Sequence, residues 1–94
     1  MSFLVEILVT RKKGIDNPEA RAIEEAINSM GYNVAQLSLG KYFLYVSDQK
    51  SKKDAEREAK ELSDKVLSNF HLETFQVVSV AEYNPKTSKS LLKN

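Results

Sequence analysis

Residues 5–32, VEILVTRKKGIDNPEARAIEEAINSMGY, decide the fold expected for this chain. They begin with an apolar segment rich in β-branched residues, which is typical of a buried strand. A basic loop follows, and Asn17-Pro18 then supplies a capping side chain and a fixed backbone angle for the first turn of a helix. Gly31 ends that helix because glycine tolerates a left-handed conformation. The stretch therefore predicts a strand, a basic loop and a capped helix, without a catalytic group.

The rest of the chain predicts three further strands and a second helix. Residues 33–39 and 42–47 meet at Gly40-Lys41, a two-residue connection with glycine first, which favours a tight hairpin turn. Residues 75–83 form the last strand. The expected fold class is α+β, a two-layer β-α-β-β-α-β sandwich in which a four-stranded antiparallel sheet carries two helices on one face.

The second helix is expected to start at Ser51, which with Asp54 resembles a helix-capping pair. Its buried stripe is expected to comprise Ala55, Ala59, Leu62, Val66 and Phe70. The chain of 94 residues is divided into one α+β domain, residues 1–83, and a basic, flexible C-terminal tail, residues 84–94, with three lysines and no acid.

The strands are too apolar for a sheet that is covered on one face only. In the first strand, Leu4 and Leu8 alternate with another apolar set on the opposite face. In the last strand, Val78 and Val80 are expected to oppose a set that includes Val77 and Ala81. An exposed apolar face marks an interaction surface, so Leu4 and Leu8 are candidate self-association residues, and we expect a homodimer or a dimer of dimers.

The amino-acid composition limits the reactions and ligands that we expect for this chain. The chain has no cysteine, and its one histidine, His71, has no evident orienting partner, so we expect no catalytic, cofactor-binding or metal-binding residues. Of 14 basic groups three lie in the tail, which leaves 11 against 13 acidic groups in residues 1–83 and argues against nucleic-acid binding. No apolar run is long enough to span a membrane, and we expect a cytoplasmic location.

Two segments invite a binding interpretation. Arg11, Lys12 and Lys13 precede a helix start that could hold an anion, but the loop lacks the glycine pattern of a phosphate loop, which favours a solvated loop or a protein contact. The aromatic strand after Gly40-Lys41 is similar to that of RNA-recognition domains. Leu44 stands where their motif needs glycine or alanine, so this alternative is weaker.

The order and spacing of several pieces resemble the PurS family, the small subunit of phosphoribosylformylglycinamidine (FGAM) synthase. These pieces are the strand VEILVT, the Lys13-Gly14-Ile15 turn, the Asn17-Pro18 helix start, Gly31-Tyr32 and Gly40-Lys41-Tyr42. The likeness covers nearly the whole of residues 1–83. Two positions depart from the family: Asn17 stands where aspartate is frequent, and Ser38 stands where arginine is frequent. Asparagine caps a helix as well as aspartate does, whereas Ser38 puts in doubt any partner contact that needs a guanidinium group.

The resemblance implies a subunit that is inactive alone but belongs to an ATP-dependent C–N ligase of purine biosynthesis, with glutamine as nitrogen donor. It implies a bridge between a synthetase subunit (PurL), which would bind ATP and Mg, and a glutaminase subunit (PurQ), with support for ammonia transfer. Together with exposed turns, it makes these residues candidate partner contacts: Arg11, Lys12, Lys13, Asp16, Gly40, Lys41 and Tyr42. The alternatives are an ACT-like regulatory domain that binds a small molecule and an RNA-binding module.

Overall fold

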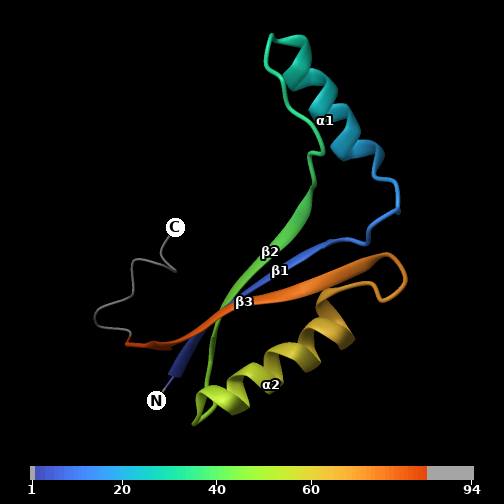
Figure 1. The fold of residues 1–94 in the computed structure, drawn as a ribbon. Helices are drawn as coiled ribbons and strands as arrows, with labels where there is room; N and C mark the ends of the chain where they lie inside the picture. The colour runs from blue at the N-terminus through green and yellow to red at the C-terminus, as the bar shows by residue number, and fades with distance from the viewer. Residues whose placement is uncertain (1, 85–94) are drawn as a thin grey trace.

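The computed structural model describes residues 2–84 and has the order β-α-β-α-β. The elements are β1 (Ser2–Arg11), α1 (Pro18–Ser29), β2 (Gly40–Ser47), α2 (Lys52–Leu62) with a π-helical turn η1 (Ser63–Leu67), and β3 (Glu73–Tyr83). The α+β class is confirmed, but the four-stranded sheet is wrong, because the described residues form one sheet of three strands (Figure 1). The predicted tail lies outside the described residues except for Asn84.

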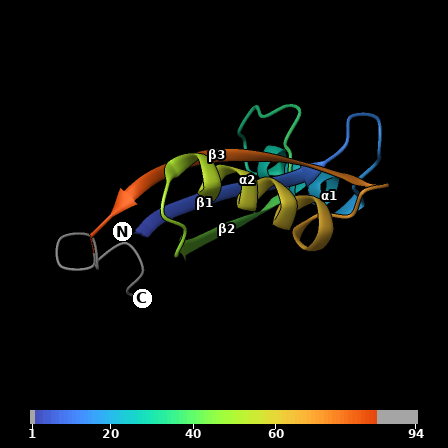
Figure 2. The ribbon, with the colours of Figure 1, turned by 90° about the horizontal axis from the view of Figure 1, so that it is seen from below.

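The sheet has the order β2-β1-β3, with β1 antiparallel to both neighbours. Side chains of β1 alternate between half-buried and buried from Ser2 to Thr10. The buried set packs beneath α2, which lies across one face of the sheet (Figure 2). The core consists of Phe3, Val5, Ile7, Val9, Ala55, Ala59 and Val80.

A bulge in β3 changes the faces predicted for its second half. Glu6 pairs with Ser79 while Ile7 pairs with Val77, so Val78 is an extra residue without a partner on β1. One extra residue reverses the alternation beyond it. As a result Val80 joins the core opposite Val5, and the prediction that it shares a face with Val78 is wrong.

Helix α1 begins as predicted, but it does not cover the sheet. The Asn17 side chain accepts hydrogen bonds from the backbone N–H groups of Glu19 (3.1 Å) and Ala20 (3.4 Å), and Gly31 adopts a φ of 101° just after the helix. The helix then projects beyond one end of the sheet (Figure 1). The prediction of two helices on one face is therefore wrong, since only α2 lies there.

Residues 33–39 run back along α1 instead of forming a strand. This path accounts for the missing fourth strand and for the position of α1 away from the sheet. The Asn28 side chain donates to the Val34 carbonyl (2.9 Å) and accepts from the Val34 N–H (2.7 Å). Glu24 accepts from the Leu37 N–H at 2.7 Å. Side chains of α1 thus satisfy backbone groups that a strand would have used in a ladder.

Gly40 is the first residue of β2 rather than part of a hairpin turn. It pairs with Thr10, and a Cβ added to it would lie 2.4 Å from the Val9 carbonyl oxygen. The glycine is needed because the backbone of β1 approaches closely, not because a turn demands it.

The end of α2 widens into the π-helical turn η1, which changes the predicted stripe. Ala55 and Ala59 are buried, as expected, but the stripe continues through buried Ser63 and half-buried Leu67. Leu62, Val66 and Phe70, assigned to the stripe from the sequence, are exposed. The wider turn keeps a four-residue spacing on the side that faces the sheet.

We expect opposite effects on stability from changing the serine that begins this turn and the serine that follows it. The Ser63 hydroxyl is buried without a hydrogen-bond partner, whereas the Ser68 hydroxyl donates to the Ser63 carbonyl at 2.7 Å. We expect Ser63→Ala to raise the free energy of unfolding by about 1 kcal/mol, because no satisfied bond is lost. Ser68→Ala should lower it by about 1 kcal/mol. Urea unfolding of the two variants measures both effects, and a loss of stability in Ser63→Ala would contradict the assignment.

Candidate functional site

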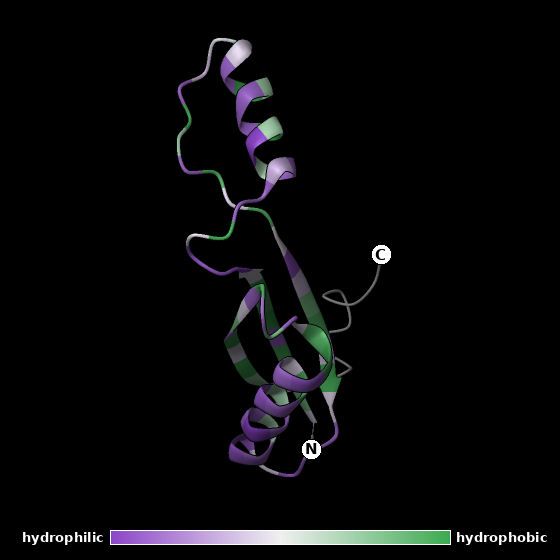
Figure 3. Ribbon diagram, turned by 90° about the vertical axis from the view of Figure 1, so that its right-hand side faces the viewer, coloured by the Kyte–Doolittle hydropathy of each residue, from purple (hydrophilic) through white to green (hydrophobic). Residues whose placement is uncertain are grey.

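The face of the sheet opposite α2 is uncovered within residues 2–84. We call it the open face; its residues are Leu4, Glu6, Leu8, Tyr42, Leu44, Val46, Gln76, Ser79 and Ala81. Tyr42 is 57% exposed and Val46 is 37% exposed, while Leu4 and Leu8 are half-buried. The strands carry hydrophobic stretches, whereas α2 is mainly hydrophilic (Figure 3). The structure therefore places both predicted self-association residues on an apolar face that meets solvent.

Glu6 interrupts the open face with a carboxylate that both outer strands hold. The hydroxyl of Tyr42 on β2 donates to Glu6 Oε1, and the hydroxyl of Ser79 on β3 donates to Glu6 Oε2. The hydrogen bond from Ser79, and then that from Tyr42, lowers the pKa of Glu6 below its usual value. The hydrogen bond between Tyr42 and Glu6 also raises the pKa of Tyr42. Glu6 is thus held in its ionised form within an apolar surface.

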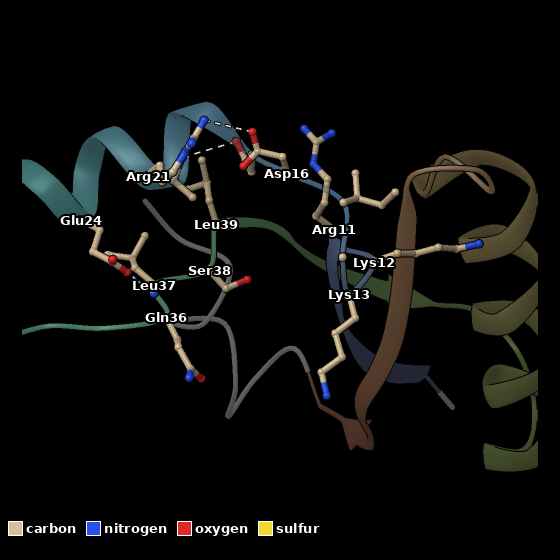
Figure 4. A pocket seen from close by; sticks show the side chains of 14 residues that line it. Arg11, Lys12, Lys13, Asp16, Arg21, Glu24, Gln36, Leu37, Ser38 and Leu39 are labelled. Carbon is tan, nitrogen blue, oxygen red and sulfur yellow. Dashed lines mark hydrogen bonds and ion pairs between the residues drawn. The ribbon is translucent and has the colours of Figure 1, made fainter.

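A hollow of about 470 Å³ lies at the end of the sheet from which α1 departs (Figure 4). We call it the end hollow; it is lined by residues 11–17 and 36–39 with Ala20, Arg21 and Glu24. A smaller hollow of about 280 Å³ adjoins it and is lined by Gly40, Lys41 and Glu73 together with the shared residues Arg11, Asn17 and Leu39.

The basic side chains of the end hollow do not converge. Arg11, Lys12 and Lys13 point in three directions (Figure 4), and the Lys12 ammonium lies 4.9 Å from the centre of the Phe70 ring. Arg21 is paired with Asp16 at 3.0 Å. Because an anion site needs donors aimed at one point, this arrangement favours a protein contact over a phosphate cradle.

Lys41 is a strand residue with partners, and not the free lysine of a hairpin turn. Its ammonium lies 3.4 Å from Glu73 Oε1 and donates to the Leu67 carbonyl at 3.5 Å. The Asn69 N–H also donates to Glu73 Oε1, at 2.7 Å, and this bond is the main cause that lowers the pKa of Glu73. Lys41 therefore helps to fix the corner between η1 and β3.

The candidate contacts divide between two places. Six line the two adjoining hollows at one end of the sheet: Arg11, Lys12, Lys13, Asp16, Gly40 and Lys41. Tyr42 instead lies on the open face with Leu4 and Leu8, one residue along the same strand as Lys41. Sequence reasoning missed Glu6 as a site residue. Its place in the sequence could have indicated this role, because the alternation of β1 puts Glu6 on the same face as Leu4 and Leu8.

The described residues hold no evident catalytic set. His71 is exposed and packs edge-to-face against Phe70 with 5.5 Å between ring centres. Within residues 2–84, no three histidine, cysteine or acidic side chains lie together as a metal site would require. None of the helices described is both long and apolar enough to cross a membrane.

Comparison with known proteins bears on the family of the chain. The family model PurS, described as phosphoribosylformylglycinamidine (FGAM) synthase, matches residues 4–81. The chain is 32% identical over 77 residues to the PurS subunit of FGAM synthase from Methanothermobacter thermautotrophicus, covering 82% of this chain and 92% of the relative. It is 31% identical over 75 residues to the Bacillus subtilis subunit, covering 79% and 88%.

Solved structures share the fold. Thermus thermophilus PurS superposes with a TM-score of 0.82 at 26% identity, covering 89% of this chain and 100% of that one. A chain of the Thermotoga maritima PurLQS structure superposes with a TM-score of 0.77 at 24% identity, covering 82% and 95%. The resemblance read from the sequence is confirmed, and the chain belongs to the PurS family of FGAM synthase.

Proposed function

We propose that this chain is the non-catalytic small subunit of FGAM synthase, joining a synthetase and a glutaminase subunit in purine biosynthesis. Membership of the PurS family supports this proposal, as does the fold shared with a chain of the Thermotoga maritima PurLQS structure. In the complete enzyme, the synthetase would use ATP and Mg, and glutamine would supply the nitrogen. The cytoplasm is the proposed location.

The observation that carries the proposal is that residues 2–84 leave two apolar surfaces uncovered. Helix α1 stands off the sheet, with Ile23 37% exposed and Met30 74% exposed. The open face leaves further large apolar side chains in contact with solvent. Burying one such side chain contributes about 1.5–3 kcal/mol, so together these surfaces are comparable with the whole stability of a small domain. Such a chain is suited to assembly.

We propose that a second copy covers the open face around Leu4 and Leu8, which gives a homodimer or a dimer of dimers. The end hollow and Lys41 lie at one end of the sheet, away from the centre of that face. They would remain available to the synthetase and glutaminase subunits. One face would thus serve self-association while one end serves the other subunits.

A bridge of this kind acts by position rather than by bond-making groups. If it holds the ammonia-releasing site against the ammonia-accepting site, ammonia passes between them without dilution into water. The ACT-like alternative drawn from the sequence rested on the β-α-β-β-α-β order, which residues 2–84 do not form. The RNA-binding alternative rested on the same order and on the aromatic strand after Gly40-Lys41. Nothing in the described structure favours either.

Reconstitution tests the proposal. FGAM formation is measured with purified synthetase and glutaminase subunits, with and without this chain, once with glutamine and once with ammonium chloride as nitrogen source. We expect glutamine-dependent turnover to require the chain and ammonia-dependent turnover to proceed without it, because only the former needs the glutaminase to be joined. The chain alone should hydrolyse neither ATP nor glutamine. Equal glutamine-dependent turnover without the chain would refute the bridging role.

A contact made by Lys41 is tested best with Lys41→Gln. A glutamate there would lie beside Glu73 and disturb the corner that Lys41 helps to fix, so it is not the neutral change that an unpaired turn lysine would allow. The glutamine variant loses one partly exposed ion pair, worth at most about 1 kcal/mol. We expect it to stay folded and self-associated but to lose joint pull-down of the synthetase and glutaminase subunits.

Lys53→Gln is the matched control, since Lys53 is exposed on α2. It should assemble like the wild type. If Lys41→Gln also assembles and supports glutamine-dependent turnover normally, Lys41 has a structural role only.

A further inference from the structure

The open face carries a single formal charge among its described residues. Glu6 lies near the centre of the central strand, opposite Leu44 on one side and Ser79 on the other. No lysine, arginine or histidine belongs to this face within residues 2–84. Any surface that covers the face must therefore bury a carboxylate for which the described part of the face supplies no cation.

Burial of an ionised carboxylate is costly unless its oxygens keep hydrogen bonds. Both oxygens of Glu6 already have one donor each, from Tyr42 and from Ser79. The donors come from the two outer strands of the same chain, so they stay in place when water is removed from the face. Hydrogen bonds to an ionised group are about twice as strong as those between neutral groups.

This arrangement bears on which partner can cover the face. A surface built to receive a basic side chain would leave carboxylate oxygens free for it, whereas here both oxygens are engaged from within. A second copy of this chain brings the same face, with apolar side chains, its own Glu6 already bonded by Tyr42 and Ser79, and no cation within residues 2–84. Such a copy needs an open face whose charge is already satisfied.

We propose that Tyr42 and Ser79 are specificity-determining residues for self-association: their hydroxyls satisfy Glu6 so that a second copy, whose open face has no cation within residues 2–84, can cover the open face. The inference rests on the self-association proposed above and assigns the role of each side chain in it. In the separated chain, water replaces either hydroxyl if it is removed. Beneath a second copy, water cannot replace the hydroxyl. The lost hydrogen bond to Glu6 therefore weakens self-association.

A double-mutant cycle measured by sedimentation equilibrium at pH 7.5 tests the proposal. Tyr42→Phe and Ser79→Ala are each made in the wild type and in a Glu6→Leu background. We expect each to raise the dissociation constant about tenfold or more in the wild type, because a hydrogen bond to a charged group is lost where water cannot replace it. In the Glu6→Leu background, each change should alter the constant less than about threefold.

Tyr32→Phe is the matched control, since Tyr32 is 64% exposed beyond α1, and it should leave the constant unchanged. Circular dichroism melting checks that each variant folds. An unchanged constant for Tyr42→Phe and Ser79→Ala, or equal changes in both backgrounds, would overturn the role assigned to these hydroxyls.

The two proposals fail in distinguishable ways. A wild type that is monomeric, or a dimer that survives glutamate at both Leu4 and Leu8, would overturn the self-association surface and this inference together. A dimer that those glutamates break, but that ignores the loss of Tyr42 and Ser79 hydroxyls, would overturn this inference alone.

Discussion

Glutamate at both Leu4 and Leu8 is expected to convert the self-associated protein into monomers. Both side chains lie on the open face, on either side of Glu6 along β1. The double change adds two carboxylates per copy to a face that already has one, and it offers them no donors. Each such group costs several kcal/mol if it is buried, so the dissociation constant should rise by at least about a thousandfold. Light scattering at micromolar concentration gives the mass directly.

Val66→Glu is the control for added charge, because Val66 is 70% exposed on η1 and lies away from the open face. It should leave the mass unchanged. If the double variant keeps the wild-type mass while Val66→Glu lowers it, then the stretch around η1, and not the open face, is the self-association surface.

Ile7→Ala is expected to produce the largest loss of stability from a single truncation. Ile7 is fully buried in the central strand and belongs to the core beneath α2. Truncating such a side chain costs about 2–5 kcal/mol, from lost burial and from the cavity that remains. In a domain of this size, the melting temperature should fall by at least about 8 °C at a fixed protein concentration.

Ile15→Ala is the same chemical change at a residue that is 38% exposed in the basic loop. It should change the free energy of unfolding by no more than about 0.5 kcal/mol. Comparable losses in both variants, measured by thermal unfolding, would mean that Ile7 is not the centre of the core.

The helix starts could be predicted because their causes are local. Asn17 and Ser51 accept hydrogen bonds from N–H groups two or three residues away, as expected from their side chains. The strand at 33–39 could not be excluded from sequence, because its backbone is bonded by Asn28 and Glu24 of α1. The sequence around Gly40 suits a hairpin turn, and it equally suits a strand whose backbone lies close to that of its neighbour. Only the second arrangement occurs here, between Gly40 and β1.

The candidate site was predictable to a similar extent. The alternation of β1 placed Leu4 and Leu8 on the correct face because a strand has a strict period of two. In β3 the same period of two gave the wrong face for Val80, because the bulge at Val78 adds one residue to the strand. The trio of Glu6, Tyr42 and Ser79 joins residues up to 73 positions apart and depends on strand order, which local patterns do not determine.

The central place of β1 has a consequence for the order in which the protein can form during its synthesis. β1 is made before the other described elements, yet it pairs with β3 from Ser2–Tyr83 to Arg11–Glu73, and β3 is made after all of them. Until residues 73–83 have left the ribosome, β1 can pair only with β2, and an isolated two-stranded ribbon is marginally stable in water. The nascent chain therefore leaves one edge of β1 unpaired until residues 73–83 have emerged, and the sheet closes only after that.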